Sequence, residues 1–146
     1  MKTVFDETTR QELVDRVNTI KENSVAQWGS MTAGQMLKHC WQWDEMAQGK
    51  KVYKQSFIGK LFGKMALKDI LKDEPLKRNL PTVPSFKITG EYAVADEKSR
   101  WIKLLGDYAQ LSNDGFMHPF FGFLTKEQTG YLVYKHADHH LRQFNC

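Results

Sequence analysis

The sequence predicts an all-α protein that forms one domain, and three observations support this fold class. Four stretches repeat their apolar residues at the three- and four-residue spacing of an amphipathic helix, and a fifth does so less regularly. Two of these stretches open with a capping-box motif. Strand-like alternation is nearly absent. We therefore expect a bundle of four helices, with one extra short helix and a long proline-containing connection.

The first two helices are expected before residue 50. Residues 8–21 form the first helix, since apolar side chains recur there at helical spacing: Leu13, Val14, Val17 and Ile20. The second helix begins after Thr32, which makes a capping box with Gln35 three residues later. Gly49 is its expected end.

A weaker helix and a long connection follow. Residues 57–72 have an apolar side, although Gly59 and Gly63 each weaken the helix by about 1 kcal/mol relative to alanine. Residues 75–95 contain three of the four prolines and should form an extended connection. Ordered connections of this length often carry function.

The last part of the chain is expected to form two more helices. Asp96 caps the first of them, and residues 113–115 end it. Residues 116–123, "FMHPFFGF", are expected to form an aromatic loop. Thr125 and Gln128 repeat the capping box and open the last helix, which runs to about residue 144.

Composition limits the class of protein. With 146 residues, 41% hydrophobic and 26% charged, the chain suits one globular domain. Cys40 and Cys146 lie too far apart in sequence to suggest a disulfide framework, which favours the cytoplasm. The first residues lack the apolar region of a secretory signal, and no apolar run approaches the roughly 20 residues of a membrane span. We expect a cytoplasmic protein with no membrane partner.

Positive charge is concentrated in residues 50–78. The chain carries a net charge of +4, whereas this segment has nine Lys or Arg and three Asp or Glu, a local +6. Four of its lysines recur every fourth residue: Lys60, Lys64, Lys68 and Lys72. The simplest interpretation is the solvated side of an amphipathic helix. Binding to nucleic acid or to another anionic surface is the alternative, but we expect no nucleic-acid partner because the segment lacks exposed aromatics and a DNA-binding motif. A third interpretation is that these lysines or Arg78 attract an anionic substrate.

The stretch "KHADHHLRQF", residues 135–144, holds three of the five histidines. At about 100° per residue, His136 and His140 fall on the shoulder of the apolar side of the last helix. His139 falls near the charged side and should be a surface neighbour. Two imidazoles spaced i, i+4 can reach one metal ion, but alone they also fit a hydrogen-bonded or surface pair.

A third imidazole strengthens the metal interpretation. His39 lies inside the apolar arc of the second helix, where a lone histidine is usually a satisfied core residue. Together with His136 and His140 it would give three protein ligands and one open position, as in catalytic zinc sites. Cys40 is turned about 100° away from His39 and is better explained as a small buried hydrophobe.

Three further residues are candidates for the substrate site or for support of the ligands. Trp43 shares the apolar arc with His39. His118 either packs its loop or handles protons at the mouth of the site. Gln143 lies close to the His136 side of its helix and either supports a ligand or is solvated. No acidic residue is placed as a general base, since Asp138 points outward and Asp44 lies on a helix flank, so a metal would have to activate water or a thiol.

Four segments together resemble the DinB-like (YfiT-like) superfamily: "WGSMTAGQMLKHC", "KRNLPTVPSF", "HPFFGFLTKEQ" and "YKHADHHLRQF". They extend in order from about Trp28 to Phe144. The resemblance implies a single DinB-like domain over residues 1–146, folded as an up-down-down-up four-helix bundle. It also implies that the family's metal triad falls on His39, His136 and His140.

The same resemblance sets the functional expectation. Some relatives are S-transferases that use low-molecular-weight thiols, and others are hydrolases. We therefore expect a divalent-metal enzyme, with Zn or Ni first, that acts on a small molecule, most readily by transfer to a thiol and otherwise by hydrolysis. A non-enzymatic module that binds an anionic partner through residues 50–78 is the alternative. Members of the superfamily that the chain resembles are often dimeric. Four tryptophans and nine phenylalanines also give more large apolar surface than a thin bundle can bury, so we expect a homodimer.

Overall fold

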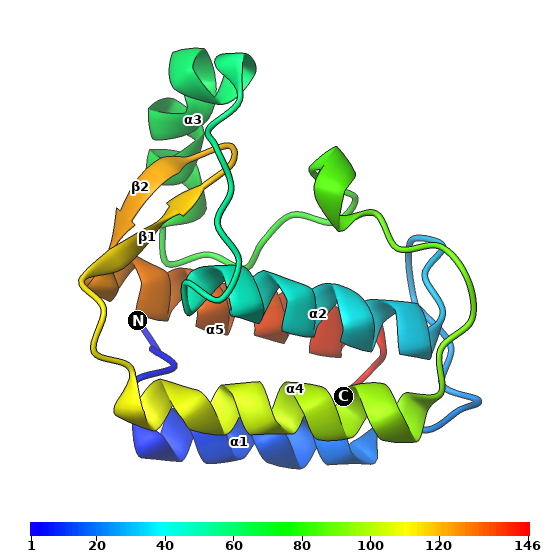
Figure 1. Ribbon diagram of the computed structural model, residues 1–146. Coiled ribbons are helices and arrows are strands. Elements are labelled where there is room, and N and C mark those ends of the chain that lie inside the picture. Colours follow the sequence, from blue (N-terminus) through cyan, green and yellow to red (C-terminus); the bar gives the residue numbers. More distant parts are fainter.

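A computed structural model describes residues 1–146 as a mostly helical protein with one small hairpin (Figure 1). The elements are α1 (Glu7–Thr19), α2 (Ala33–Ala47), α3 (Phe57–Ile70), α4 (Val94–Asp107), β1 (Gly115–His118), β2 (Gly122–Thr125) and α5 (Lys126–Gln143). A 3-10 turn, Pro84–Phe86, interrupts the long connection between α3 and α4. The hairpin is an addition to the predicted all-α fold.

Four helices surround the hydrophobic core. Helix α2 packs against α4 and α5, and α1 packs against the same two helices. In Figure 1 these four helices form the body of the molecule, and α3 with the hairpin projects from it. The core is one continuous cluster that includes Leu13, Leu37, Trp101, Leu105 and Leu141. None of the helices is long and apolar enough to cross a bilayer.

The predicted capping boxes are present and fix the starts of α2 and α5. The hydroxyl of Thr32 accepts the Gln35 N–H at 3.2 Å, while the Gln35 side chain accepts the Thr32 N–H at 3.0 Å. Thr125 and Gln128 form the same pair of bonds. Because these bonds satisfy otherwise unpaired helix N–H groups, they also fix the register of the histidines farther along each helix.

The prediction that Asp96 caps the fourth helix is wrong. Ala93, three residues earlier, is the N-cap of α4, and Asp96 lies in the first turn of the helix. The N–H of Val94 donates instead to Glu22 at 2.7 Å. This partner lies 72 residues away in sequence, so no local motif could reveal it.

The segment expected to be an aromatic loop, residues 116–123, lies within the hairpin, which runs from Gly115 to Thr125. Strands β1 and β2 are antiparallel, with Phe116 opposite Leu124 and Met117 opposite Phe123. Phe116 and Leu124 are buried, whereas Met117 and Phe123 face solvent. The segment therefore alternates with the period of a strand, and its inward side closes one end of the core.

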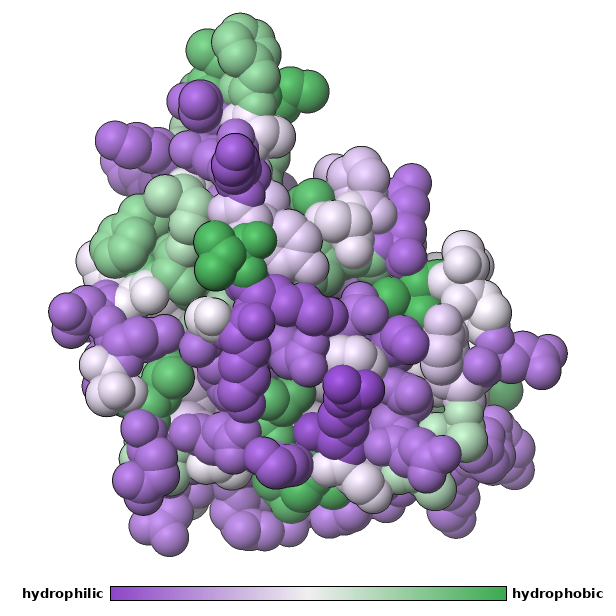
Figure 2. All heavy atoms as spheres, viewed as in Figure 1, coloured by the Kyte–Doolittle hydropathy of each residue, from purple (hydrophilic) through white to green (hydrophobic).

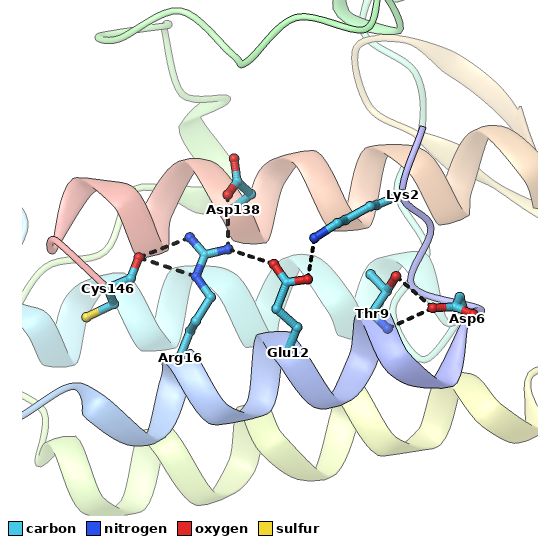
Figure 3. Close-up of polar contacts among 7 residues, drawn as sticks. All are labelled: Lys2, Asp6, Thr9, Glu12, Arg16, Asp138 and Cys146. Carbon is cyan, nitrogen blue, oxygen red and sulfur yellow. Dashed lines mark hydrogen bonds and ion pairs between the residues drawn. The ribbon is translucent and has the colours of Figure 1, made fainter.

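An ion-pair network ties the end of α5 to α1 (Figure 3). Arg16 Nη1 lies 3.0 Å from Asp138 and 3.8 Å from Glu12. The same guanidinium donates to the Cys146 carbonyl at 3.1 and 3.3 Å. The C-terminus of α5 is thereby held against α1, so the histidines of α5 belong to a fixed helix.

Helix α3 contacts the rest of the chain through its glycines. A side-chain carbon added to Gly59 or Gly63 would overlap the carbonyl oxygen of Phe120 in the hairpin turn. The two glycines thus allow the helix backbone to lie directly on the turn. Of this helix only Gly59, Gly63 and Leu67 are buried.

Candidate metal centre

The structure brings three histidines together between α2 and α5. His39 comes from α2, and His136 and His140 come from α5. One ring nitrogen from each histidine can be chosen so that the three atoms all lie within 4.8 Å of one another, and the Nε2 atoms of His39 and His136 are 3.0 Å apart. The residues chosen by helical angles are therefore those that meet.

Hydrogen bonds on the far side of two rings fix their tautomers. His39 Nδ1 lies 3.0 Å from the carbonyl oxygen of Phe86, which can only accept, so Nδ1 carries the proton. His140 Nδ1 donates in the same way to Gln143 Oε1 at 2.9 Å. In both rings Nε2 then carries a lone pair, and that of His39 lies 3.0 Å from His136 Nε2. Metal-binding histidines are commonly held by such an acceptor on the other ring nitrogen.

Gln143 lies directly behind His140, so its side chain is placed to hold this ring. Its Nε2 donates to the Trp28 carbonyl at 2.6 Å, which turns its Oε1 toward His140. The side chain is 4% exposed, so the solvated alternative is wrong. The bond to the Trp28 carbonyl also joins the loop before α2 to the end of α5.

The triad is buried enough to stay neutral. Burial lowers the pKa of His39, and it lowers the pKa of His136 and of His140 well below the ordinary value. The positive charge that a neighbouring ring would carry adds to this effect, and for His136 all four other histidines contribute to the lowered pKa. Neutral imidazole is the form that binds a metal, so the site holds its ligands ready at neutral pH.

One pair of donor nitrogens has a separation close to that of two ligands on a tetrahedral ion. Two nitrogens at 2.0–2.1 Å from a tetrahedral zinc lie about 3.3 Å apart. The Nε2 atoms of His39 and His136 lie close to that separation. Three imidazoles would leave one position free for water or substrate.

Trp43 and His118 flank the triad in different ways. Trp43 stacks on His136, with ring centroids 5.0 Å apart and planes inclined by 23°. His118 Nδ1 accepts the N–H groups of Phe120 and Phe121, both at 3.1 Å. Burial lowers the His118 pKa to about 3. His118 therefore packs in the hairpin and fixes the conformation of its turn. It is not part of the cluster of His39, His136 and His140.

The expectation that His139 is a surface neighbour is wrong. Only 8% of the residue is exposed, and its ring packs edge-on against Trp28 at 5.5 Å. The guanidinium of Arg78 lies over the Trp28 ring, with its Cζ atom 4.3 Å from the ring centroid. These covering residues come from distant parts of the chain, so helical angles could not reveal the burial. The angles were correct in excluding His139 from the triad.

Sequence reasoning missed the buried carboxyl group of Asp44. It accepts hydrogen bonds from Trp101 Nε1 at 2.8 Å and from the Tyr108 hydroxyl at 3.0 Å. Burial raises the pKa of this group to about 7 despite both bonds. Its partners lie on and just beyond α4, so Asp44 links α2 to α4. Cys40, one turn earlier, is buried as expected of a small hydrophobe.

Comparison with known proteins gives one family. The sequence model of the family described as "Protein of unknown function (DUF1569)" matches residues 4–146. No curated protein and no solved structure matches the chain. The family match covers almost the whole chain, so the chain belongs to the family of proteins of unknown function DUF1569.

Proposed function

We propose that this protein is a divalent-metal-dependent enzyme whose ligands are His39, His136 and His140. One observation carries the proposal: three neutral imidazoles converge, two of them buried and that of His136 half-buried, and the two buried rings are held in the metal-binding tautomer by acceptors behind the ring. Core histidines without a ligand role need no such convergence. Zinc and nickel are the first choices, since both are bound by imidazole.

We also propose that α1, α2, α4 and α5 form the up-down-down-up bundle of the DinB-like superfamily. The packing of α2 against α4 and α5, and of α1 against the same helices, supports this arrangement. Ligands projecting inward from facing helices are a recurrent feature of such bundles. The hairpin and α3 are then additions to the bundle.

Transfer to a low-molecular-weight thiol is the reaction that the site supports best. When bound, a divalent ion would lower the pKa of a thiol or a water at the open position. The known partners of the rings are a backbone carbonyl and an amide, and neither can take a proton from attacking water. Without a base, the proton must leave to solvent, and a thiol, with an ordinary pKa of about 8.5, releases it more readily than water, with a pKa of about 15.7. Hydrolysis is therefore the second candidate.

The surroundings indicate which part of a small substrate could lie near the ligands. Trp43 stacks on His136 and offers an apolar wall. Arg78 is exposed and lies over Trp28, whose ring contacts His139 beside His140. A carboxylate on the thiol or on its co-substrate would find this guanidinium at the edge of the site.

The test begins with elemental analysis of protein purified without added metal. We expect about one divalent ion per chain, followed by consumption of a small thiol when electrophilic substrates are supplied. His136→Ala should lose both the ion and the activity, whereas His139→Ala should keep the ion. Metal-loaded protein that hydrolyses esters or amides without consuming thiol would establish the second candidate. Protein that takes up no ion would refute the proposal.

A further inference from the structure

The outward side of α3 is apolar and uncovered. Five large side chains on it are 51% to 75% exposed, and together they define the α3 outer face: Phe57, Ile58, Leu61, Phe62 and Met65. Isolated exposed hydrophobic residues are ordinary, but five on two turns of one helix form a patch. Figure 2 shows hydrophobic atoms gathered at the end of the projection that α3 forms in Figure 1.

This face is not a consequence of poor packing. The opposite side of α3 lies on the hairpin turn through Gly59 and Gly63, which allow direct contact with Phe120. With about 100° per residue, the outer face spans roughly 140° and is centred almost opposite these glycines. The helix is therefore anchored by one side and presents its larger apolar side to the surroundings.

Unpaired lysines border the outer face. Lys60, Lys64 and Lys68 are exposed and reach no carboxylate, whereas Lys72 pairs with Asp69. They belong to the segment 50–78, whose net charge is +6. The surface thus combines a row of apolar side chains with a border of positive charge.

An anionic lipid surface is the occupant that satisfies both features. An amphipathic helix with Phe and Leu on one face and lysines beside it lies in the interfacial plane of a bilayer. The apolar side chains enter the acyl boundary while the lysines extend to the phosphates. Such docking needs no helix that crosses the bilayer. The sequence analysis predicted no membrane partner. The proposed contact differs from that prediction, because it places the protein on the surface of a bilayer.

Other occupants match only one of the two features. A second copy of the chain would bury the apolar side chains, but it would bring two sets of unpaired lysines together. Nucleic acid would neutralise the lysines, and Phe57 and Phe62 are exposed contrary to the sequence expectation for this segment. However, Ile58, Leu61 and Met65 are aliphatic and offer bases no stacking surface.

We propose that the α3 outer face docks on the surface of a bilayer that contains anionic phospholipid. The inference is independent of the metal centre, since the two sites share no residue. Docking would place the body of the molecule, with its histidine triad, beside the bilayer.

The test is sedimentation of the full chain with vesicles. Phosphatidylcholine vesicles with phosphatidylglycerol should bind the protein, and phosphatidylcholine alone should bind it at least about tenfold more weakly. Lys60→Gln with Lys64→Gln should weaken binding to anionic vesicles by about 25-fold, or about fivefold for each lysine. Ile58→Ser with Phe62→Ser should weaken it by at least about 100-fold.

Two control variants each remove an exposed side chain of the same kind, one apolar and one lysine, from outside α3. Val25→Ser removes an apolar side chain that is 73% exposed, and Lys103→Gln removes a lysine whose side chain is 75% exposed. Both should bind vesicles as the parent does. All the replaced side chains are exposed, and unchanged thermal midpoints will show that each variant is folded.

Several results would overturn the proposal. They are no binding to either vesicle, equal binding to both, or undiminished binding by the Ile58 and Phe62 variant. A dimer in light scattering that this variant converts to a monomer, without vesicle binding, would assign the face to a second copy. Salt-sensitive binding to duplex DNA, without vesicle binding, would assign the segment to nucleic acid.

Discussion

The bond between Gln143 and His140 predicts what happens when Gln143 is replaced by leucine. Gln143 accepts from His140 Nδ1 and donates to the Trp28 carbonyl, and it is almost fully buried. Leucine fills a similar volume but leaves the buried donor of His140 and the part-buried carbonyl of Trp28 unpaired. Each unpaired group costs about 1–3 kcal/mol, so the free energy of unfolding of the metal-free protein should fall by about 2–6 kcal/mol. Because the ring of His140 loses its anchor, the metal affinity should fall about 10–100-fold.

A second substitution separates the two effects. Gln143→Glu keeps an acceptor for His140 but cannot donate to the Trp28 carbonyl. It should therefore recover most of the metal affinity while the protein stays destabilised. Gln110→Leu, at an exposed position, is the matched control and should change neither quantity.

The assay is competition with a chelator for the affinity, together with urea unfolding of the metal-free protein for the stability. If Gln143→Leu unfolds more easily but binds metal as tightly as the parent, Gln143 has no influence on the ligand and the reasoning is refuted. If Gln143→Glu binds as weakly as Gln143→Leu, the acceptor is not what matters.

Two further predictions concern stability. Burial raises the pKa of Asp44 from 3.8 to about 7, so the folded state holds this proton more tightly than the unfolded chain. Asp44 should thus contribute a fall of up to about 4 kcal/mol in the free energy of unfolding as pH rises from about 4 to about 7. The buried histidines contribute a rise over the same range because their pKa values are lowered, so the test is the difference between the parent and Asp44→Asn in urea unfolding. The stability of the parent relative to Asp44→Asn should decrease as pH rises, and a difference that is constant across the range would contradict the assignment. Gly63→Ala should cost about 1–3 kcal/mol, because the added carbon would overlap the Phe120 carbonyl. Gly106→Ala, which meets no atom within 4 Å, should instead stabilise by about 0.5–1 kcal/mol; equal effects of the two would contradict the close contact of α3 with the hairpin.

Local patterns were sufficient for the helices and for the ligand geometry. The capping boxes at Thr32 and Thr125 depend on residues three apart, so the sequence contains the whole motif. Helical angles placed His39, His136 and His140 on inward sides because buried helices keep a regular period. Once these sides face one core, the three rings meet.

Features that depend on distant partners could not be predicted. The burial of His139 requires Trp28, and the cap of α4 requires Glu22. Asp44 is a polar residue in an apolar region of the sequence. Its role in linking α2 to α4 depends on hydrogen bonds from Trp101 and Tyr108, which lie far away in the chain. Periodicity likewise showed that α3 has an apolar side, but it could not show that this side faces outward.

The central claim is that His39, His136 and His140 hold one divalent ion and that His139 does not. Metal stoichiometry of the four single alanine variants, measured side by side with the parent, tests it most directly. The account predicts a loaded parent and a loaded His139→Ala variant, with little or no metal in the other three. Because burial lowers the pKa of the three rings, the parent should keep its ion at neutral pH and lose it only as acid protonates them. A His139→Ala variant that is empty while His140→Ala stays loaded, or four variants that all match the parent, would contradict the account.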